Sequence, residues 1–176
     1  PLAIRKPEFF DKKGLPYFLA LSIDANKKAK RLGISFTTKL KPDPIVQNTL
    51  TGKISKNQPY IFDICHLGQM AEIKGVGIEF AFEVSSLIFG GIENWNSDDN
   101  LSNAAKKVGL DLIQLRESVT VHEDKIIEQI KQNQVDQLNA GHHGVPLTVI
   151  GEKYFFGQDQ FEKIMETLKE NGLKER

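Results

Sequence analysis

Hydrophobic positions repeat at helical spacing over most of residues 1–141. Apolar side chains recur at intervals of three and four residues, which places them on one face of a helix. A glycine follows most of these stretches, as is typical of helix C-termini. The pattern predicts helices over residues 16–32, 57–75, 78–89, 101–108, 111–118 and 120–139. Alternating apolar and polar residues over 34–40 indicate a surface loop or a short strand, and the two prolines of 41–44 favour extended backbone there.

Two helix starts carry capping signals. Ser97 or Asp98 is placed to cap the helix whose apolar pattern runs over residues 101–108. Thr120 and Glu123 have the spacing of a capping box, in which each side chain bonds the other residue's backbone N–H. We therefore expect the last long helix to begin at this box.

The C-terminal residues change pattern. Pro146 precedes an apolar stretch, Gly151-Glu152 suits a two-residue hairpin turn, and an aromatic stretch follows. Residues 147–150 and 153–156 are therefore predicted to be antiparallel strands, with Val145–Pro146 as a cis peptide bond. The next apolar residues share one face of a closing helix: Phe161, Ile164, Met165 and Leu168. A two-stranded hairpin is only marginally stable alone, so we expect it to pair with strands outside this sequence or with a partner chain.

Two spaced motifs in this segment, Gly144-Val145-Pro146 and Phe156-Gly157-Gln158-Asp159, carry a family resemblance. The segment resembles the thioredoxin-like proteins grouped with DsbA, kappa-class glutathione transferases and 2-hydroxychromene-2-carboxylate isomerases. The resemblance extends upstream through PDPIVQNTLTGKISKNQPYIF and EVSSLIFGGIENW to the opening PLAIRKPEFF. It implies an α/β, thioredoxin-like fold with a large α-helical insertion. Residues 1–141 would form the insertion, with Pro1–Lys6 as a loop leading into it, and residues 142–176 the C-terminal ββα half.

The reactive motif of that family is not found in the sequence. The family carries Ser-Pro-Tyr or Cys-x-x-Cys after its first strand, whereas the similar Gly14-Leu15-Pro16-Tyr17 has leucine at the nucleophile position. We therefore expect the first strand, first helix and second strand, with the catalytic nucleophile, to lie upstream of Pro1. The single Cys65 has apolar neighbours at helical spacing, Ile61 and Ile64, and is expected to pack in the core.

Composition excludes several classes of function. Lys plus Arg and Asp plus Glu are both 23, so no net charge is available to attract nucleic acid or an anionic membrane. No apolar run approaches the roughly 20 residues that span a bilayer. With 40% apolar and 26% charged residues the chain can form a core, and we expect a cytoplasmic protein, or a periplasmic one if it is an oxidoreductase.

The resemblance assigns glutathione as cofactor and places it on four residues. Val145, before the cis Pro146, would offer its backbone N–H and C=O to the thiol ligand as an added strand does. Gln158 and Asp159 would grip the γ-glutamyl end, with Asp159 on the ammonium group. The alternatives are that Pro146 only shapes a turn and that Asp159 only caps a helix.

Other polar residues are weaker candidates. The pair His142-His143 lacks the further ligands of a metal site, so no metal is expected, and His142 is instead a candidate for proton transfer. A substrate pocket between the insertion and the thioredoxin half is expected to draw on four residues: Tyr17, Asp24, Asn94 and Trp95. Trp95 is equally compatible with a lid or with a core anchor.

These features favour a glutathione-dependent isomerase or transferase of the 2-hydroxychromene-2-carboxylate isomerase type, acting on a small aromatic carboxylate or related electrophile. One alternative is a DsbA-like thiol-disulfide oxidoreductase with its Cys-x-x-Cys upstream. The other is a catalytically inactive thioredoxin-like binding module or a truncated fragment. A homodimer is expected because exposed strands need to be covered.

Overall fold

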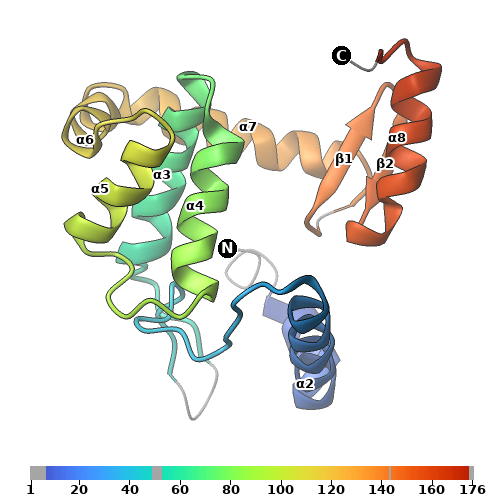
Figure 1. Ribbon diagram of the computed structural model, residues 1–176, viewed down its shortest axis with the longest axis horizontal. Coiled ribbons are helices and arrows are strands. Elements are labelled where there is room, and N and C mark those ends of the chain that lie inside the picture. Colours follow the sequence, from blue (N-terminus) through green and yellow to red (C-terminus); the bar gives the residue numbers. More distant parts are fainter. Residues whose placement is uncertain (1–6, 49–52, 143, 175–176) are drawn as a thin grey trace. The chain divides into compact units, whose positions relative to one another are not determined.

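A computed structural model describes residues 7–48, 53–142 and 144–174 of the chain. Helices predominate, and a short antiparallel hairpin lies near the C-terminus (Figure 1). The elements, in order, are α2 (Pro7–Leu32), α3 (Pro59–Ile73), α4 (Gly77–Phe89), α5 (Asp98–Lys107), α6 (Leu112–Val121), α7 (Glu123–Asn139), β1 (Leu147–Ile150), β2 (Lys153–Phe156), the 3-10 helix η1 (Gln158–Gln160) and α8 (Phe161–Glu170). The mixed α/β, helix-rich architecture predicted from the sequence is confirmed.

The chain divides into two compact units, Pro1–Ile126 and Ile127–Arg176, with the boundary inside α7. The sequence placed a domain boundary later, between residues 141 and 142, and that boundary stays a prediction. The expected loop at Pro1–Lys6 lies outside the described residues.

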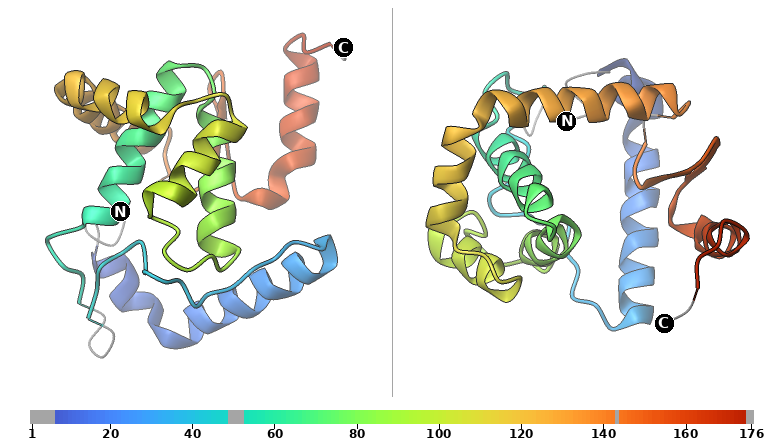
Figure 2. Two further views of the ribbon diagram at one scale, coloured as in Figure 1. Left: turned by 60° about the vertical axis from the view of Figure 1, so that its left-hand side comes forward. Right: turned by 90° about the horizontal axis from the view of Figure 1, so that it is seen from above.

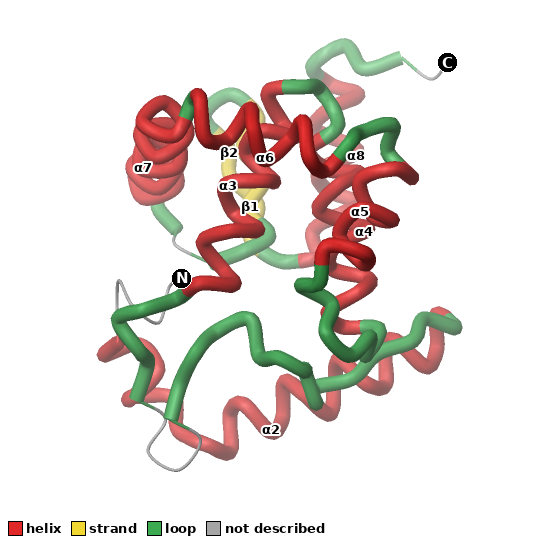
Figure 3. The backbone as a smooth tube through the Cα atoms, turned by 90° about the vertical axis from the view of Figure 1, so that its left-hand side faces the viewer, coloured by secondary structure: helices red, strands yellow, loops and turns green. Residues whose placement is uncertain are grey.

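The first unit has a core built by four helices (Figure 3). Helix α3 packs on α4 and α6, and α5 packs on α4 and α6, so each helix has two neighbours. Their inward side chains are almost fully buried, and the largest of them are Leu67, Phe80, Leu101 and Leu115; Trp95, from the turn between α4 and α5, is fully buried as well. Burying this apolar surface stabilises the unit, because each fully buried side chain of this size contributes about 1.5–3 kcal/mol.

The long connection from Gly33 to Gln58 is fixed to this core by a few polar contacts. The described residues of 34–40 form a loop, and the Thr37 N–H donates to the Phe89 carbonyl at 2.7 Å. Further along, the Trp95 indole N–H donates to the Pro42 carbonyl at 2.8 Å. The Lys41–Pro42 bond is cis, whereas the sequence predicted only extended backbone there.

Two local predictions in this unit are wrong. Thr120 and Glu123 do not form a capping box, because Thr120 lies inside α6, where its hydroxyl donates to the Arg116 carbonyl at 3.0 Å. Cys65 is exposed, because the buried face of α3 consists of Leu67, Met70 and Ala71. The cap at Ser97 is confirmed, since its hydroxyl accepts from the Asn100 N–H at 3.3 Å.

The second unit contains the hairpin and α8, which lie side by side in Figures 1 and 2. The register pairs Leu147 with Phe156 and Ile150 with Lys153, which confirms the predicted antiparallel strands. Directly opposed residues of an antiparallel pair point to the same face of the sheet, so Lys153 shares a face with its partner Ile150. Its ammonium group lies 3.7 Å from the Glu170 carboxylate, and this face is therefore the one covered by α8.

Candidate functional site

The Val145–Pro146 peptide bond is cis, as the sequence predicts. Val145 is 78% exposed and lies just before β1. Among the described residues nothing accepts from its N–H or donates to its carbonyl. The chain therefore presents one free donor and one free acceptor beside the proline, as an unpaired strand edge does.

A backbone hydrogen bond joins this loop to the second predicted motif. The Gly157 N–H donates to the Pro146 carbonyl at 3.0 Å, so the two motifs, distant by ten residues in sequence, lie next to each other. Gly157 has φ 101° and ψ 158°, a conformation essentially restricted to glycine. This bend directs the chain from β2 into η1, which carries Gln158 and Asp159.

Asp159 is exposed and caps neither η1 nor α8. In the described part of the chain its carboxylate accepts one hydrogen bond, from the side-chain amide of its neighbour Gln160 at 3.2 Å. The capping alternative considered for Asp159 thus has no support from the geometry. The start of η1 leaves backbone N–H groups without acceptors in the helix.

Gly144 lies against two rings that contact each other. The centroids of the His142 and Phe156 rings lie 3.9 Å apart with their planes tilted by 30°. A Cβ on Gly144 would lie 2.3 Å from Phe156 Cε2 and 2.7 Å from His142 Cε1, closer than real contacts allow. The Gly144 N–H donates to His142 Nδ1 at 2.9 Å, and its carbonyl accepts from Gln137 Nε2 at 3.1 Å. Both polar groups of this backbone are therefore occupied by side chains.

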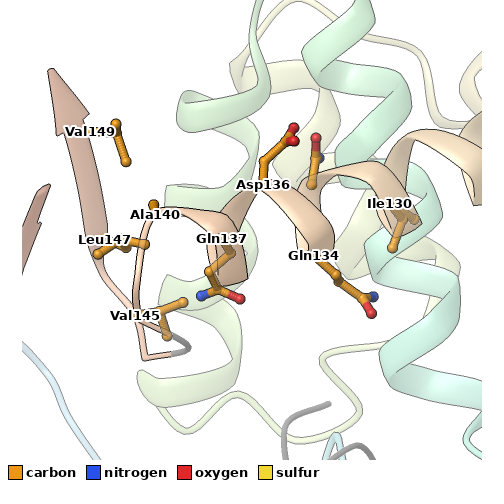
Figure 4. A pocket seen from close by; sticks show the side chains of 9 residues that line it. Ile130, Gln134, Asp136, Gln137, Ala140, Val145, Leu147 and Val149 are labelled. Atoms are coloured by element: carbon orange, nitrogen blue, oxygen red, sulfur yellow. The ribbon is translucent and has the colours of Figure 1, made fainter. Parts of the chain in front are cut away.

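An open groove of about 550 Å³ runs beside the loop, between α7 and β1 (Figure 4). One side is apolar and comes from the loop and β1, and the other is rich in amide side chains from α7. The residues that line it are Ile130, Asn133, Gln134, Asp136, Gln137, Ala140, Val145, Leu147 and Val149. The side chain of Gln137 thus both borders the groove and bonds the loop.

The four predicted pocket residues all belong to the first unit. Trp95 is fully buried in the first unit, and Asp24 forms an ion pair with Lys28 at 3.0 Å on α2. Asn94 has φ 53° and donates its backbone N–H to the Lys41 carbonyl at 2.9 Å. Tyr17 lies in α2, and its side chain is outside the described part, as is His143. A substrate pocket built from these residues stays a prediction.

Cys65 lacks the lowered pKa that is typical of an activated cysteine nucleophile. Desolvation by its surroundings raises the pKa of the thiol, although the residue as a whole is exposed, and a raised pKa lowers the thiolate fraction. In the part of the chain that the structure describes, no group of three histidine, cysteine or acidic residues is placed to hold a metal ion. Nor is any described helix both long and apolar enough to cross a membrane.

A cis-proline loop that leads into a hairpin and a C-terminal helix is the arrangement of a thioredoxin-like domain. A family model for the DSBA-like thioredoxin domain matches residues 65–169, which is more than half of the chain. The chain therefore belongs to this DSBA-like family, and the resemblance is confirmed at the level of the family. The wider superfamily includes thiol-disulfide oxidoreductases, isomerases and transferase-like proteins. Neither the comparison with curated proteins nor that with solved structures gave a match.

Sequence reasoning gave no role to three residues that shape the site: Gln137, Gly144 and Gly157. The two glycines were visible as members of the motifs, but the sequence did not show why glycine is needed there. Gly144 lies too close to two rings for a side chain, and Gly157 has a φ of 101°. Gln137 gave no signal, because its partner lies seven residues away across a turn.

Proposed function

We propose that this chain carries the thiol-binding half of a glutathione-dependent isomerase or transferase of the 2-hydroxychromene-2-carboxylate isomerase type. The observation that carries the proposal is the bond from the Gly157 N–H to the Pro146 carbonyl. It ties the residue after Val145 to the residue that leads the chain into η1, where the exposed Asp159 caps no helix. Glutathione has a cysteinyl backbone that fits the free backbone groups of Val145 and a γ-glutamyl end that fits the Asp159 carboxylate.

Two parts of glutathione would be held by different groups of the chain. The Val145 N–H and C=O bond the cysteinyl residue as an added strand would, which orients its thiol. Asp159 takes the α-ammonium group, while backbone N–H groups at the start of η1 face the α-carboxylate. The aromatic carboxylate substrate is not assigned to any described residue, and neither is the nucleophile-activating group.

Asp159→Ala tests the assignment by calorimetry. Truncating one partner of a desolvated charge pair costs roughly 2–5 kcal/mol, and an exposed site falls at or below the lower value. We therefore expect glutathione to bind up to about 30-fold more weakly. Affinity for 2-mercaptoethanol, which lacks the γ-glutamyl group, should not change.

Glu162→Gln is the matched control, because it removes a negative charge from the first turn of α8, three residues further on. It should leave glutathione affinity within about twofold, since exposed charges act weakly on one another. Equal losses for glutathione and 2-mercaptoethanol would contradict the role given to Asp159. Absence of glutathione binding by the unmodified chain would contradict the function itself.

Thiol-disulfide exchange is the second candidate, favoured by the match to a DSBA-like domain. The free backbone groups of Val145 would serve an extended cysteine-containing peptide equally well. Binding of a reduced peptide that lacks a γ-glutamyl group, unaffected by Asp159→Ala, would favour this candidate over the first.

We further propose that the chain acts as a homodimer. Ile78 and Phe82 lie one turn apart on α4 and are 81% and 68% exposed, which is a costly arrangement for an isolated helix face. Phe82→Glu should convert a dimer into a monomer in light scattering at micromolar concentration, whereas Glu79→Gln on the same helix should not. A monomeric unmodified chain would refute this proposal.

A further inference from the structure

The loop before β1 is held by two side chains that have no role in the proposed ligand contacts. Gln137 comes from the last turns of α7 and donates to the Gly144 carbonyl at 3.1 Å. His142 accepts from the Gly144 N–H at 2.9 Å through Nδ1, which leaves the ring proton on Nε2. Together they occupy both hydrogen-bonding groups of the residue that precedes Val145.

This arrangement fixes the direction of the next peptide unit. The Gly144 carbonyl and the Val145 N–H belong to the same planar peptide group, so holding one sets the plane of the other. On its other side Val145 is joined to Pro146, whose carbonyl accepts a hydrogen bond from the Gly157 N–H. Val145 therefore lies between two restrained neighbours while its own polar groups remain free.

We propose that Gln137 and His142 are positioning residues that preorganise the backbone of Val145 for its ligand. They do so without touching the ligand, and the inference rests on the proposed function for the identity of that ligand. Preorganisation raises affinity because the ordering cost has already been met in the free protein. The amide-lined side of the groove thus orients the loop beside it.

Two substitutions at His142 separate the hydrogen bond from the ring contact. His142→Phe keeps a ring over Phe156 and removes the acceptor. His142→Asn removes the ring and keeps an acceptor, because an Asn side chain commonly bonds the backbone N–H two residues further on. If positioning depends on the bond, the Asn variant should resemble the unmodified chain more closely than the Phe variant does.

The first measurement is amide hydrogen exchange at Gly144 by NMR. His142→Phe should speed this exchange about tenfold, the equivalent of losing one hydrogen bond of ordinary strength. His142→Asn should restore most of the protection. The Val145 amide has no described acceptor and serves as the internal reference, since it should exchange rapidly in all variants.

The second measurement is glutathione affinity by calorimetry. We expect His142→Phe and Gln137→Leu each to weaken binding about three- to tenfold, and the double variant to lose less than the product because both act on one residue. Gln134→Leu is the control, as it lines the same groove and bonds no described residue. Far-UV circular dichroism should show unchanged thermal unfolding of the control and a folded His142→Asn at the temperature of the binding measurement.

The outcomes distinguish this inference from the proposed function. If the unmodified chain binds glutathione and His142→Phe binds it equally well, positioning is wrong and the function stands. If His142→Asn binds as weakly as His142→Phe, the ring contact matters and the hydrogen bond does not, which also overturns the inference. If the unmodified chain does not bind glutathione, the proposed function fails, and exchange at Gly144 still decides whether His142 restrains the loop.

Discussion

Gln58 is the buried polar residue on which the long loop of the first unit depends. Its side chain is 1% exposed and makes three hydrogen bonds to backbone groups. Oε1 accepts from the Val46 N–H at 2.8 Å, and Nε2 donates to the carbonyls of Val46 at 2.7 Å and Ser55 at 2.8 Å. Gln58 thus completes the pairing that a neighbouring strand would otherwise supply to Val46.

Gln58→Leu removes all three bonds while keeping a similar volume. The Val46 carbonyl retains a bond from the Ser55 N–H at 2.9 Å, so two backbone groups lose their described partner. Each unpaired buried group costs about 1–3 kcal/mol, and both sites are only half-buried, so we expect a loss of about 2–4 kcal/mol in the free energy of unfolding.

Urea unfolding followed by fluorescence measures this loss, because Trp95 is the single tryptophan and its indole bonds the same loop at Pro42. Gln47→Leu is the matched control: it is exposed in that loop, makes one bond to Asp43, and should cost less than about 0.5 kcal/mol. A loss below about 1 kcal/mol for Gln58→Leu, or equal losses for the two variants, would refute the reasoning.

Three further predictions concern Gly144, Gly68 and the thiol of Cys65. Gly144→Ala should lower the free energy of unfolding of the second unit by about 1–3 kcal/mol, because the added methyl group meets the Phe156 ring at 2.3 Å. Gly68→Ala in α3, where a Cβ meets nothing within 4 Å, should instead stabilise the first unit by about 0.5–1 kcal/mol. Amide hydrogen exchange measures the stability of each unit separately and so checks both substitutions. Cys65 should react with iodoacetamide more slowly than free cysteine at neutral pH, since its pKa is raised, and a faster reaction would contradict this assignment.

The hairpin could be predicted from sequence because its determinants are local. A Gly-Glu turn fixes the register of the strands on either side, and the observed pairing of Ile150 with Lys153 follows from it. The cap at Ser97 is local in the same sense, since it needs only the N–H three residues on. Interactions within three or four residues leave few competing arrangements.

The inner face of α3 could not be predicted in this way. The helix carries apolar residues on more than one side, so the spacing of Ile61, Ile64 and Cys65 was as helical as that of the residues that are buried. Which side turns inward is decided by packing on the next helix, α4, and on α6, which begins almost forty residues after α3 ends; the spacing within α3 does not show either contact. The predicted capping box at Thr120 and Glu123 is absent for a similar reason. Thr120 belongs to α6, and its hydroxyl donates to a carbonyl of that same helix instead of capping α7.

The candidate site has features that the local sequence predicts and features that it does not. Its motifs are local and visible, but the groups that would bind a ligand at Val145 belong to the backbone and are the same for almost every residue type. Replacing the Val145 side chain would leave its N–H and C=O in place, so substitutions there should matter less than at the residues that hold the loop. Sensitivity should be highest at Gly144 and Gly157, where side chains are excluded by a ring contact and by a φ of 101°. A site that works through its main chain is therefore best located by the residues that shape the backbone.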